Sequence, residues 1–338
     1  MRDIQSARLV LVPLDGSTTA EEALPVAAAI AHRDGLRLLL VAVHEPLPAL
    51  RSLGEELDIE LEKQRGAQLE DYLKWAANSV ATTHGVEPSW TLLRGSPARS
   101  LAQQARARNA SLIIMTTHGH SGLSRFWLGS VADQLLRRVS TPVLLLHPKR
   151  QGRSEFRHVL VALDGSQQAE SVLNGAVDFG SLMPEVHYSL LRVVEPPIPV
   201  ITRLAVYPRP IKSVERQEAH ARAELDTLAE SLRERGVSVR TQVLVGRNVA
   251  EAIVEDACAQ AADLIVVGTH GACGLERMVL GSVADKVIRA APQAVLVVPT
   301  AASASQPAVA SHRRSSADLL SRASGWVRSR PGAVPAPV

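Results

Sequence analysis

The chain contains the same series of segments twice, and this internal duplication limits its possible folds more than any other feature. Matching segments follow one another in the same order, and the offset between partners drifts only from 149 to 152 residues. Each copy therefore has the size of one domain. The matched pairs are "RLVLVPLDGS" (8–17) with "HVLVALDGS" (158–166), "VAVHEP" (41–46) with "LRVVEP" (191–196), "LLRGSPARSLAQQA" (92–105) with "VLVGRNVAEAIVEDA" (243–257), and "PVLLLHP" (142–148) with "AVLVVPT" (294–300).

Within each copy, short runs of Val, Ile and Leu alternate with longer segments whose apolar residues recur three and four positions apart. The short runs are apolar nearly throughout, as in strands that helices cover on both faces. This alternation predicts an α/β fold of two tandem doubly wound domains, each a five-stranded parallel sheet flanked by helices. In the first copy we expect strands at 8–14, 36–43, 89–93, 111–116 and 142–146, and helices at 19–33, 55–80, 97–108 and 129–139.

The same comparison predicts the domain boundaries. Residues 1–148 form the first domain, 149–157 a charged linker without periodicity, and 158–300 the second domain. Residues 301–338 are rich in Ala, Ser, Pro and Arg, which predicts a disordered basic tail. Within the tail, 316–327 has apolar residues at helical spacing and is a candidate docking helix, although contact with a membrane is not expected from so short a segment.

Charge and composition exclude several classes of protein. The net charge is +3, but five arginines and one aspartate lie in 301–338, so the rest of the chain is close to neutral. With only 3% aromatic residues, a dedicated nucleic-acid surface is not expected. Cys258 and Cys273 cannot form a disulfide framework or a structural zinc site on their own. The sequence shows no signal peptide and no apolar stretch long enough for a bilayer, which favours the cytoplasm.

The stretch "VVGTHGACGLERMVLGSVADKV" (266–287) carries the clearest functional signal. Gly268 and Gly271 are separated by two residues, nine residues follow, and Gly281-Ser282 opens a predicted helix. Backbone without Cβ lets a phosphate chain approach closely, and a helix N-terminus offers it free N–H groups. The spacing therefore predicts an anion-binding loop. The first copy repeats it in "IMTTHGHSGLSRFWLGSVADQL" (114–135).

This loop, following an apolar strand and preceded in each copy by "DGS", resembles the universal stress protein (UspA-like) family, here as a tandem two-domain member covering 8–148 and 158–300. The resemblance implies an adenine-nucleotide site for ATP, with Mg²⁺ among the phosphate oxygens, although other members of the family bind no nucleotide. Carried over by position, Asp164 and Val193 would meet the adenine and ribose, and Val267, Gly268, Gly271, Gly281, Ser282 and Val283 would hold the ribose and phosphates. The first-copy counterparts are Asp15, Val43, Met115, Gly119, Gly129, Ser130 and Val131.

The two copies differ at the first loop glycine. Thr116 stands where the second copy has Gly268, and a β-branched residue disfavours positive φ and blocks close approach, although its hydroxyl could donate to a phosphate if the backbone is extended. Conversely, Pro13 is closer to the pattern of the nucleotide-binding members than Ala162 is. We expect the second loop to be the better phosphate cradle, and the occupancy of each cleft stays open.

Other polar residues near the loops have two interpretations each. Asp15 and Asp164 either contact a ligand or cap the following helix. His118 and His270 lack an identifiable carboxylate partner, so a loop-stabilising or phosphate-near role is favoured over general-base catalysis. Cys273 is interpreted as a small apolar residue rather than a redox-sensitive thiol, and Arg125 and Arg277 either reach a phosphate or are solvated.

The sequence thus predicts an ATP-binding regulatory protein of the stress response and not an enzyme, since no Walker-type loop and no paired carboxylates beside a nucleophile are present. A weak ATP hydrolase and a nucleotide-free interaction module are the alternatives. The apolar fifth strands, 142–146 and 294–298, would leave an uncovered sheet edge. We therefore expect the two domains to pair through them within one chain, with a homodimer and an unidentified protein partner as further possibilities.

Overall fold

The computed structural model describes residues 8–46, 55–117, 128–147, 155–166, 168–196, 200–201, 206–207, 211–269 and 280–300. The predicted tail 301–338 lies outside these residues, and of the linker only 155–157 are described. The first half contains, in chain order, β1 (Leu9–Leu14), α1 (Thr18–Glu21), α2 (Ala23–Asp34), β2 (Arg37–His44), α3 (Glu55–His84), β3 (Ser89–Arg94), α4 (Pro97–Ala107), β4 (Ala110–Thr116), α5 (Ser130–Leu136) and β5 (Val143–Leu146).

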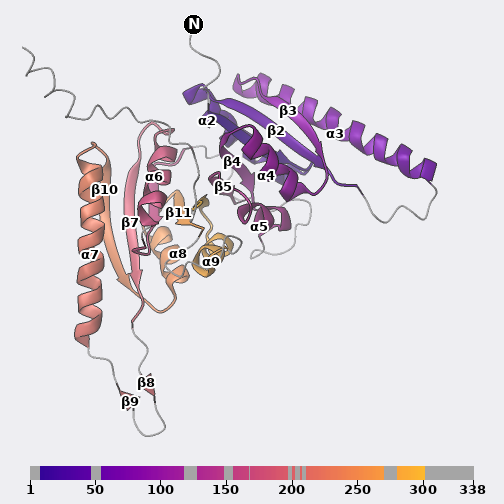
Figure 1. Cartoon of the computed structure of the whole chain (residues 1–338). Coiled ribbons are helices and arrows are strands. Elements are labelled where there is room, and N and C mark those ends of the chain that lie inside the picture. Colours follow the sequence, from indigo (N-terminus) through magenta and orange to yellow (C-terminus); the bar gives the residue numbers. More distant parts are fainter. Residues whose placement is uncertain are drawn as a thin grey trace, which may run out of the picture. The chain divides into compact units, whose positions relative to one another are not determined.

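Among the described residues, the second half repeats this order without a counterpart of α1 and with a small insertion, a pair of two-residue strands before its longest helix (Figure 1). Its elements are β6 (His158–Ala162), α6 (Ala169–Gly180), β7 (His187–Val194), β8 (Val200–Ile201), β9 (Val206–Tyr207), α7 (Ile211–Arg233), β10 (Ser238–Val245), α8 (Val249–Ala259), β11 (Leu264–Gly268), α9 (Ser282–Ala290) and β12 (Ala294–Val298).

All strands except β8 and β9 belong to one ten-stranded sheet in the order β10-β7-β6-β11-β12-β5-β4-β1-β2-β3. Within each half every neighbouring pair is parallel, and the strand order reverses beside β1 and beside β6. This is the predicted doubly wound topology, and it is confirmed for both halves. The crevice where strand order reverses is where such folds place their ligands.

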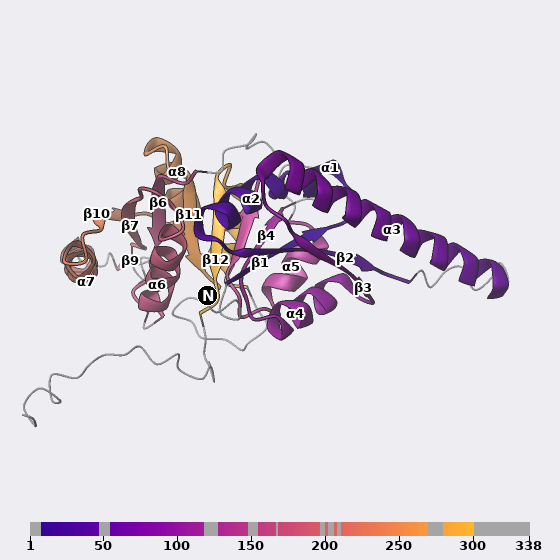
Figure 2. The ribbon, with the colours of Figure 1, turned by 90° about the horizontal axis from the view of Figure 1, so that it is seen from above.

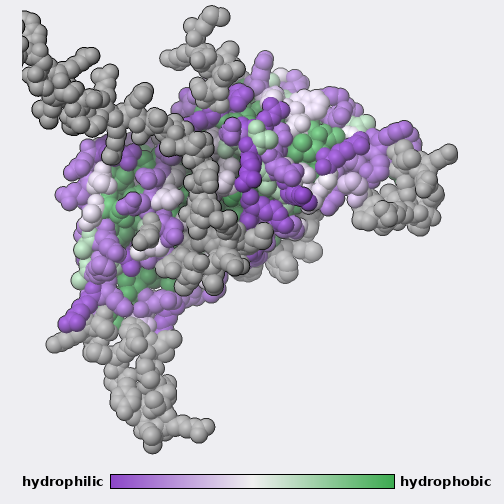
Figure 3. All heavy atoms as spheres, in the orientation of Figure 1, coloured by the Kyte–Doolittle hydropathy of each residue, from purple (hydrophilic) through white to green (hydrophobic). Residues whose placement is uncertain are grey.

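Helices cover both faces of the sheet, which explains why the strands are apolar nearly throughout. One apolar cluster packs α2, α3, α6 and α7 against the sheet, and the other packs α4, α5, α8 and α9. Figure 2 shows this layering for the first half, with α2 and α3 on one side of the strands and α4 and α5 on the other. Hydrophilic residues predominate on the described surface seen in Figure 3. Among the described helices, none combines the length and apolar character that crossing a bilayer requires.

The two halves are joined through their fifth strands. β5 and β12 pair antiparallel, with Leu144 opposite Leu296, and both side chains are fully buried. An apolar edge strand is stabilised by covering its unpaired backbone groups. Each half covers the edge of the other, so the predicted pairing within one chain is confirmed. A weaker polar contact across the same junction lies between α9 and α5, where Arg289 Nη2 is 3.9 Å from Asp133 Oδ1.

Two local features differ from the sequence-based expectation. The helix expected at 19–33 is two helices, α1 and α2, with Glu22 between them. Pro25 is the cause, because proline has no N–H for the carbonyl four residues earlier and is tolerated only in the first turn. A new helix starting at Ala23 places Pro25 in that turn. The strands β8 and β9 were not expected, since two-residue runs show no periodicity.

Candidate functional site

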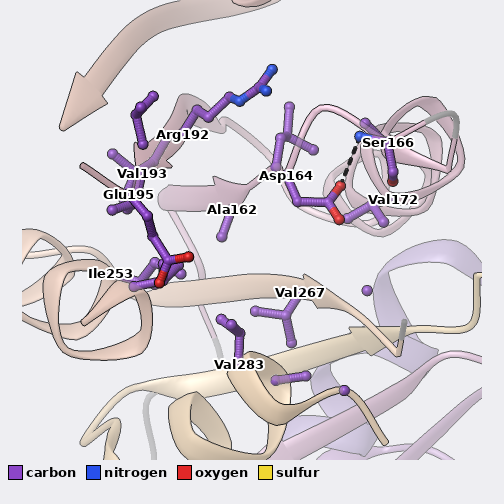
Figure 4. Close-up of a pocket in the computed structure, with 18 of the residues that line it drawn as sticks. Ala162, Asp164, Ser166, Val172, Arg192, Val193, Glu195, Ile253, Val267 and Val283 are labelled. Carbon is purple, nitrogen blue, oxygen red and sulfur yellow. Dashed lines mark hydrogen bonds between the residues drawn. The ribbon is translucent and has the colours of Figure 1, made fainter. Parts of the chain in front are cut away.

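A cavity of about 500 Å³ opens at the carboxyl ends of β6, β7 and β11, beside the N-terminus of α9. It lies at the crevice that the strand order predicts. Its lining is mainly apolar, with a few polar side chains around it, as is usual for small-molecule sites (Figure 4). The residues that line it are Ala162, Leu163, Asp164, Ser166, Ala169, Val172, Leu191, Arg192, Val193, Val194, Glu195, Gln217, His220, Val249, Ile253, Val267, Gly268, Gly281, Ser282, Val283 and Ala284.

The first-turn amides of α9, which have no acceptor within the helix, belong to residues that line this cavity. Gly281 is the N-cap residue and contributes no side-chain cap. The first intrahelical bond runs from Asp285 N to Gly281 O at 2.9 Å, so the amides of Ser282, Val283 and Ala284 precede it. All three residues line the cavity. Together with the helix dipole, these amides make an end of the cavity that favours a negatively charged group.

The position of α9 is fixed by a hydrogen bond at the base of the preceding loop. Gly281 N donates to Thr269 O at 2.7 Å, and Thr300 N donates to Thr269 Oγ1 at 3.0 Å. The helix start is thereby tied to the end of β11 and to the residues that follow β12. The sequence-based interpretation made Gly281 a donor to the phosphates and missed this structural role, for which the spacing alone gives no signal.

Asp164 lies on the turn that follows β6. Its Oδ1 accepts a hydrogen bond from Ser166 N at 3.0 Å, and Asp15 Oδ1 accepts one from Ser17 N at the same distance. Both carboxylates thus stabilise an Asx-type turn. Neither aspartate is the N-cap of the helix that follows, since Ser17 has that place in the first half and Gln168 in the second. The helix-cap interpretation of the two aspartates is therefore wrong.

The structure brings the second-half candidates together around the cavity. Asp164 follows β6, Val193 lies near the end of β7, Val267 and Gly268 end β11, and Gly281, Ser282 and Val283 begin α9; all of them line it. Gly271 lies outside the described residues, as do His270, Cys273 and Arg277.

The first-half candidates lie at equivalent places in the fold. Asp15 follows β1, Val43 is in β2, Met115 is in β4, and Gly129, Ser130 and Val131 begin α5. Gly119 lies outside the described residues, as do His118 and Arg125.

Thr116 and Gly268 occupy matching positions as the last residues of β4 and β11. Each pairs in register with the neighbouring fifth strand, Thr116 with Leu146 and Gly268 with Val298. Both residues therefore have extended backbone, and the expected conflict between a β-branched side chain and positive φ does not arise here. At this position the two halves differ by the side chain of Thr116, with its bulk and its hydroxyl, and this side chain is buried.

Four polar residues that sequence reasoning missed also line the cavity: Arg192, Glu195, Gln217 and His220. Arg192 forms an ion pair with Glu224 of α7, and His220 Nε2 lies 3.3 Å from Glu224 Oε1. In Figure 4 the Glu195 side chain extends toward Val283, whereas the Arg192 side chain points away from Val283. Arg192 was the one detectable signal, because it interrupts an apolar strand where the first half has Ala42.

Comparisons with known proteins agree with this architecture. The model of the universal stress protein family matches residues 7–147 and 155–299, once in each half. A universal stress protein of Mycolicibacterium smegmatis is 29% identical over 299 residues, which cover 86% of this chain and 96% of that protein. One of Thermus aquaticus is 36% identical over 139 residues, covering 41% of this chain and 98% of that protein. The crystal structure of a universal stress protein from Archaeoglobus fulgidus shares the fold, with a TM-score of 0.65 at 21% identity over 88% of this chain and 98% of that one.

Proposed function

The chain belongs to the universal stress protein family, and on that premise we propose that its second-half cleft binds ATP and that the protein acts as a nucleotide-dependent regulator. One observation carries the proposal: Ser282, Val283 and Ala284, whose first-turn amides have no acceptor within α9, line the same cavity as Asp164 and Val193. A site for a nucleotide needs one end that binds the anionic phosphates and another that accepts the nucleoside. A volume of about 500 Å³ is within the range of small-molecule sites.

The residues present fit the parts of ATP. The α9 amides would hold phosphate oxygens, and the apolar side chains of Val193, Ile253 and Val267 would contact the base. The Asp164 carboxylate is an acceptor suited to a ribose hydroxyl. In the part of the chain that the structure describes, no three His, Cys, Asp or Glu residues are grouped to hold a metal ion. Mg²⁺ would therefore be held mainly by the phosphates themselves.

We propose no strong catalytic role for this cleft. Its described polar side chains include Asp164, Glu195 and His220, and the His220 ring lies beside the carboxylate of Glu224 rather than beside a nucleophile. Steady multiple turnover of ATP by the purified protein, well above that of a Ser282→Asp variant, would instead support the weak hydrolase.

Two measurements test ATP binding. Mass spectrometry of the freshly purified, denatured protein should detect a co-purified adenine nucleotide. Titration with a fluorescent ATP analogue should saturate, and Ser282→Asp should weaken it by at least about tenfold, because a carboxylate in the first turn repels phosphate. The substitution suits a helix N-terminus, so the fold should tolerate it.

The matched control is Ser130→Asp, which places the same charge at the start of α5 in the first half. If only the second cleft binds, Ser130→Asp leaves the titration unchanged. A wild-type protein with no co-purified nucleotide and no saturable binding contradicts the proposal and leaves the nucleotide-free interaction module.

A further inference from the structure

A second, smaller cavity of about 270 Å³ adjoins the nucleotide cleft. The smaller cavity lies between the turn after β6 and α7, and Glu224, Leu225 and Leu228 of that helix line it. Arg192 lines both cavities. The side chain thus bridges from the end of β7 to the helix that closes this side of the cleft.

Two contacts hold the guanidinium group in place. Arg192 Nη1 donates to Glu224 Oε2, and the two side chains are 20% and 38% exposed, so the pair is partly shielded from solvent. The second contact is with backbone: a Cβ added at Gly165 would overlap the guanidinium group. Gly165 also has a φ of +71°, a backbone conformation that residues with a side chain rarely adopt. Arg192 therefore packs directly on the turn that carries Asp164 and Ser166 (Figure 4).

The corresponding turn of the first half is held differently. Ser17 Oγ donates to Asp15 Oδ1 at 2.6 Å and accepts from Ala20 N at 3.1 Å, so this turn is fastened to its own helix. Ala42 stands in the strand where the second half has Arg192, and a Cβ at Gly16 would meet nothing within 4 Å. In the second half Ser166 does not cap α6, whose N-cap is Gln168. What packs on the turn in the second half is Arg192, which Glu224 of α7 holds.

We propose that Arg192 is a positioning residue for the nucleoside end of the second cleft, acting through Glu224 and the Asp164–Ser166 turn. Clamped between α7 and this turn, it holds the Asp164 carboxylate where a ribose or base can meet it. The proposal rests on the nucleotide-binding function of the same cleft. It distinguishes the two ends of the ligand, because the α9 amides that face the phosphates are on the other side of the cavity from the clamp.

The test compares Arg192→Met and Glu224→Gln with the wild-type chain for two probes, adenosine and inorganic tripolyphosphate, each in competition with a fluorescent ATP analogue. Both variants should bind adenosine about tenfold more weakly, as expected when a contacting group is misplaced by a fraction of an ångström. Tripolyphosphate binding should be unchanged. Arg192→Lys should recover part of the adenosine affinity, since it keeps the charge but not the paired donors.

The matched control is Arg222→Met, on the same helix. Arg222 pairs with Glu218 at 3.1 Å, an exposed pair that faces neither the turn nor the cleft lining. Its removal should leave both probes unaffected. If the wild type binds adenosine and Arg192→Met binds it with the same affinity, the proposed role of Arg192 is wrong. It is also wrong if Arg192→Met loses as much affinity for tripolyphosphate as for adenosine, because that loss would mean a global effect. If the wild type binds neither probe, the proposed nucleotide function itself fails.

Discussion

The amide of Gly129 donates a hydrogen bond of 2.8 Å to the carbonyl of Thr117, and the pair closes the base of the loop between β4 and α5. Gly281 and Thr269 repeat the bond in the second half at 2.7 Å. Gly129 has no positive φ, since its backbone is extended at φ −56° and ψ 145°. The need for glycine is steric: a Cβ at position 129 would lie 3.1 Å from the Thr117 carbonyl oxygen.

Gly129→Ala should therefore destabilise the fold. A contact that tight forces the loop base or α5 to shift, and we expect the free energy of unfolding to fall by about 1–3 kcal/mol. Urea denaturation followed by circular dichroism measures it. The control is Gly66→Ala inside α3, where an added Cβ would meet nothing within 4 Å. That variant should gain about 0.5–1 kcal/mol; equal losses in both variants would contradict the steric explanation.

The duplicated pattern predicted the sheet well because burial on both faces leaves a strong signal in each strand. Even the junction of the halves followed from sequence, since the apolar fifth strand Val143–Leu146 had to find a partner edge. The pairing of a strand is predicted from the pattern of an entire segment, so one misinterpreted residue does not change the prediction.

The candidate site was only partly predictable because single contacts decide it. The period of α7 shows which face is apolar, but not that Gln217 and His220 of its polar face reach the cleft lining. The role of Arg192 depends on its meeting Glu224, which lies 32 positions away in the sequence. The Gly129–Thr117 bond is equally invisible, because glycine spacing predicts a turn without saying which carbonyl closes it.

Ala261→Gly should stabilise the protein. Ala261 ends the segment after α8 with a φ of +51°, and its first-half counterpart Asn109 has +50°. Asparagine tolerates this left-handed conformation, whereas alanine is strained in it by roughly 1–2 kcal/mol. Glycine removes the strain, and we expect a gain of about 1 kcal/mol after its larger backbone entropy is counted. The urea midpoint measures the change.

The control for that prediction is Ala252→Gly within α8, which should cost about 1 kcal/mol. A loss of stability in Ala261→Gly of the same size would mean that the left-handed backbone is not strained there.

His158 should make the fold less stable in mild acid. Its Nδ1 lies 3.1 Å from Gln260 O and its Nε2 2.8 Å from Ser189 Oγ, which also accepts from Arg240 Nε at 2.7 Å. Burial, and then the Arg240 charge, lower the pKa of His158 from its ordinary 6.5. The unfolded chain therefore takes up the proton first as the pH falls. Stability is complete above pH 6.5 and declines below it until the lower folded-state pKa is passed.

Urea titrations between about pH 8 and about pH 5 test this, around the ordinary range of histidine. In His158→Asn, whose side chain does not titrate, the midpoint should be lower at neutral pH and its decline with acid shallower. An unchanged slope in that variant would assign the acid sensitivity to other groups.

Leu144→Ala should weaken the junction between the halves far more than Asp133→Asn, which removes the ion pair across that junction. Leu144 and its partner Leu296 are both fully buried in the β5–β12 pairing. Truncating such a leucine costs about 2–5 kcal/mol. Asp133→Asn removes the partly exposed contact with Arg289 and also the charge of the Asp133–Arg137 pair within α5, and pairs of this kind contribute roughly 1 kcal/mol or less each. If thermal unfolding ranks the two variants in the opposite order, the halves are held by charge rather than by apolar burial.

Ser17→Ala and Ser166→Ala should differ although the two serines occupy equivalent turns. Ser17 is buried, and its Oγ caps α1 through Ala20 N while also binding Asp15. Loss of such a cap costs about 0.5–2 kcal/mol. Ser166 bonds Asp164 through its backbone amide, which alanine retains, so Ser166→Ala should change stability by no more than about 0.5 kcal/mol. The proposed clamp places Arg192 on that turn, so Arg192→Ala added to Ser166→Ala should loosen the turn, which would be visible as faster hydrogen exchange at the amide of Ser166. Equal costs for the two single serine variants would mean that both turns are held alike, and the contrast between the halves would be lost.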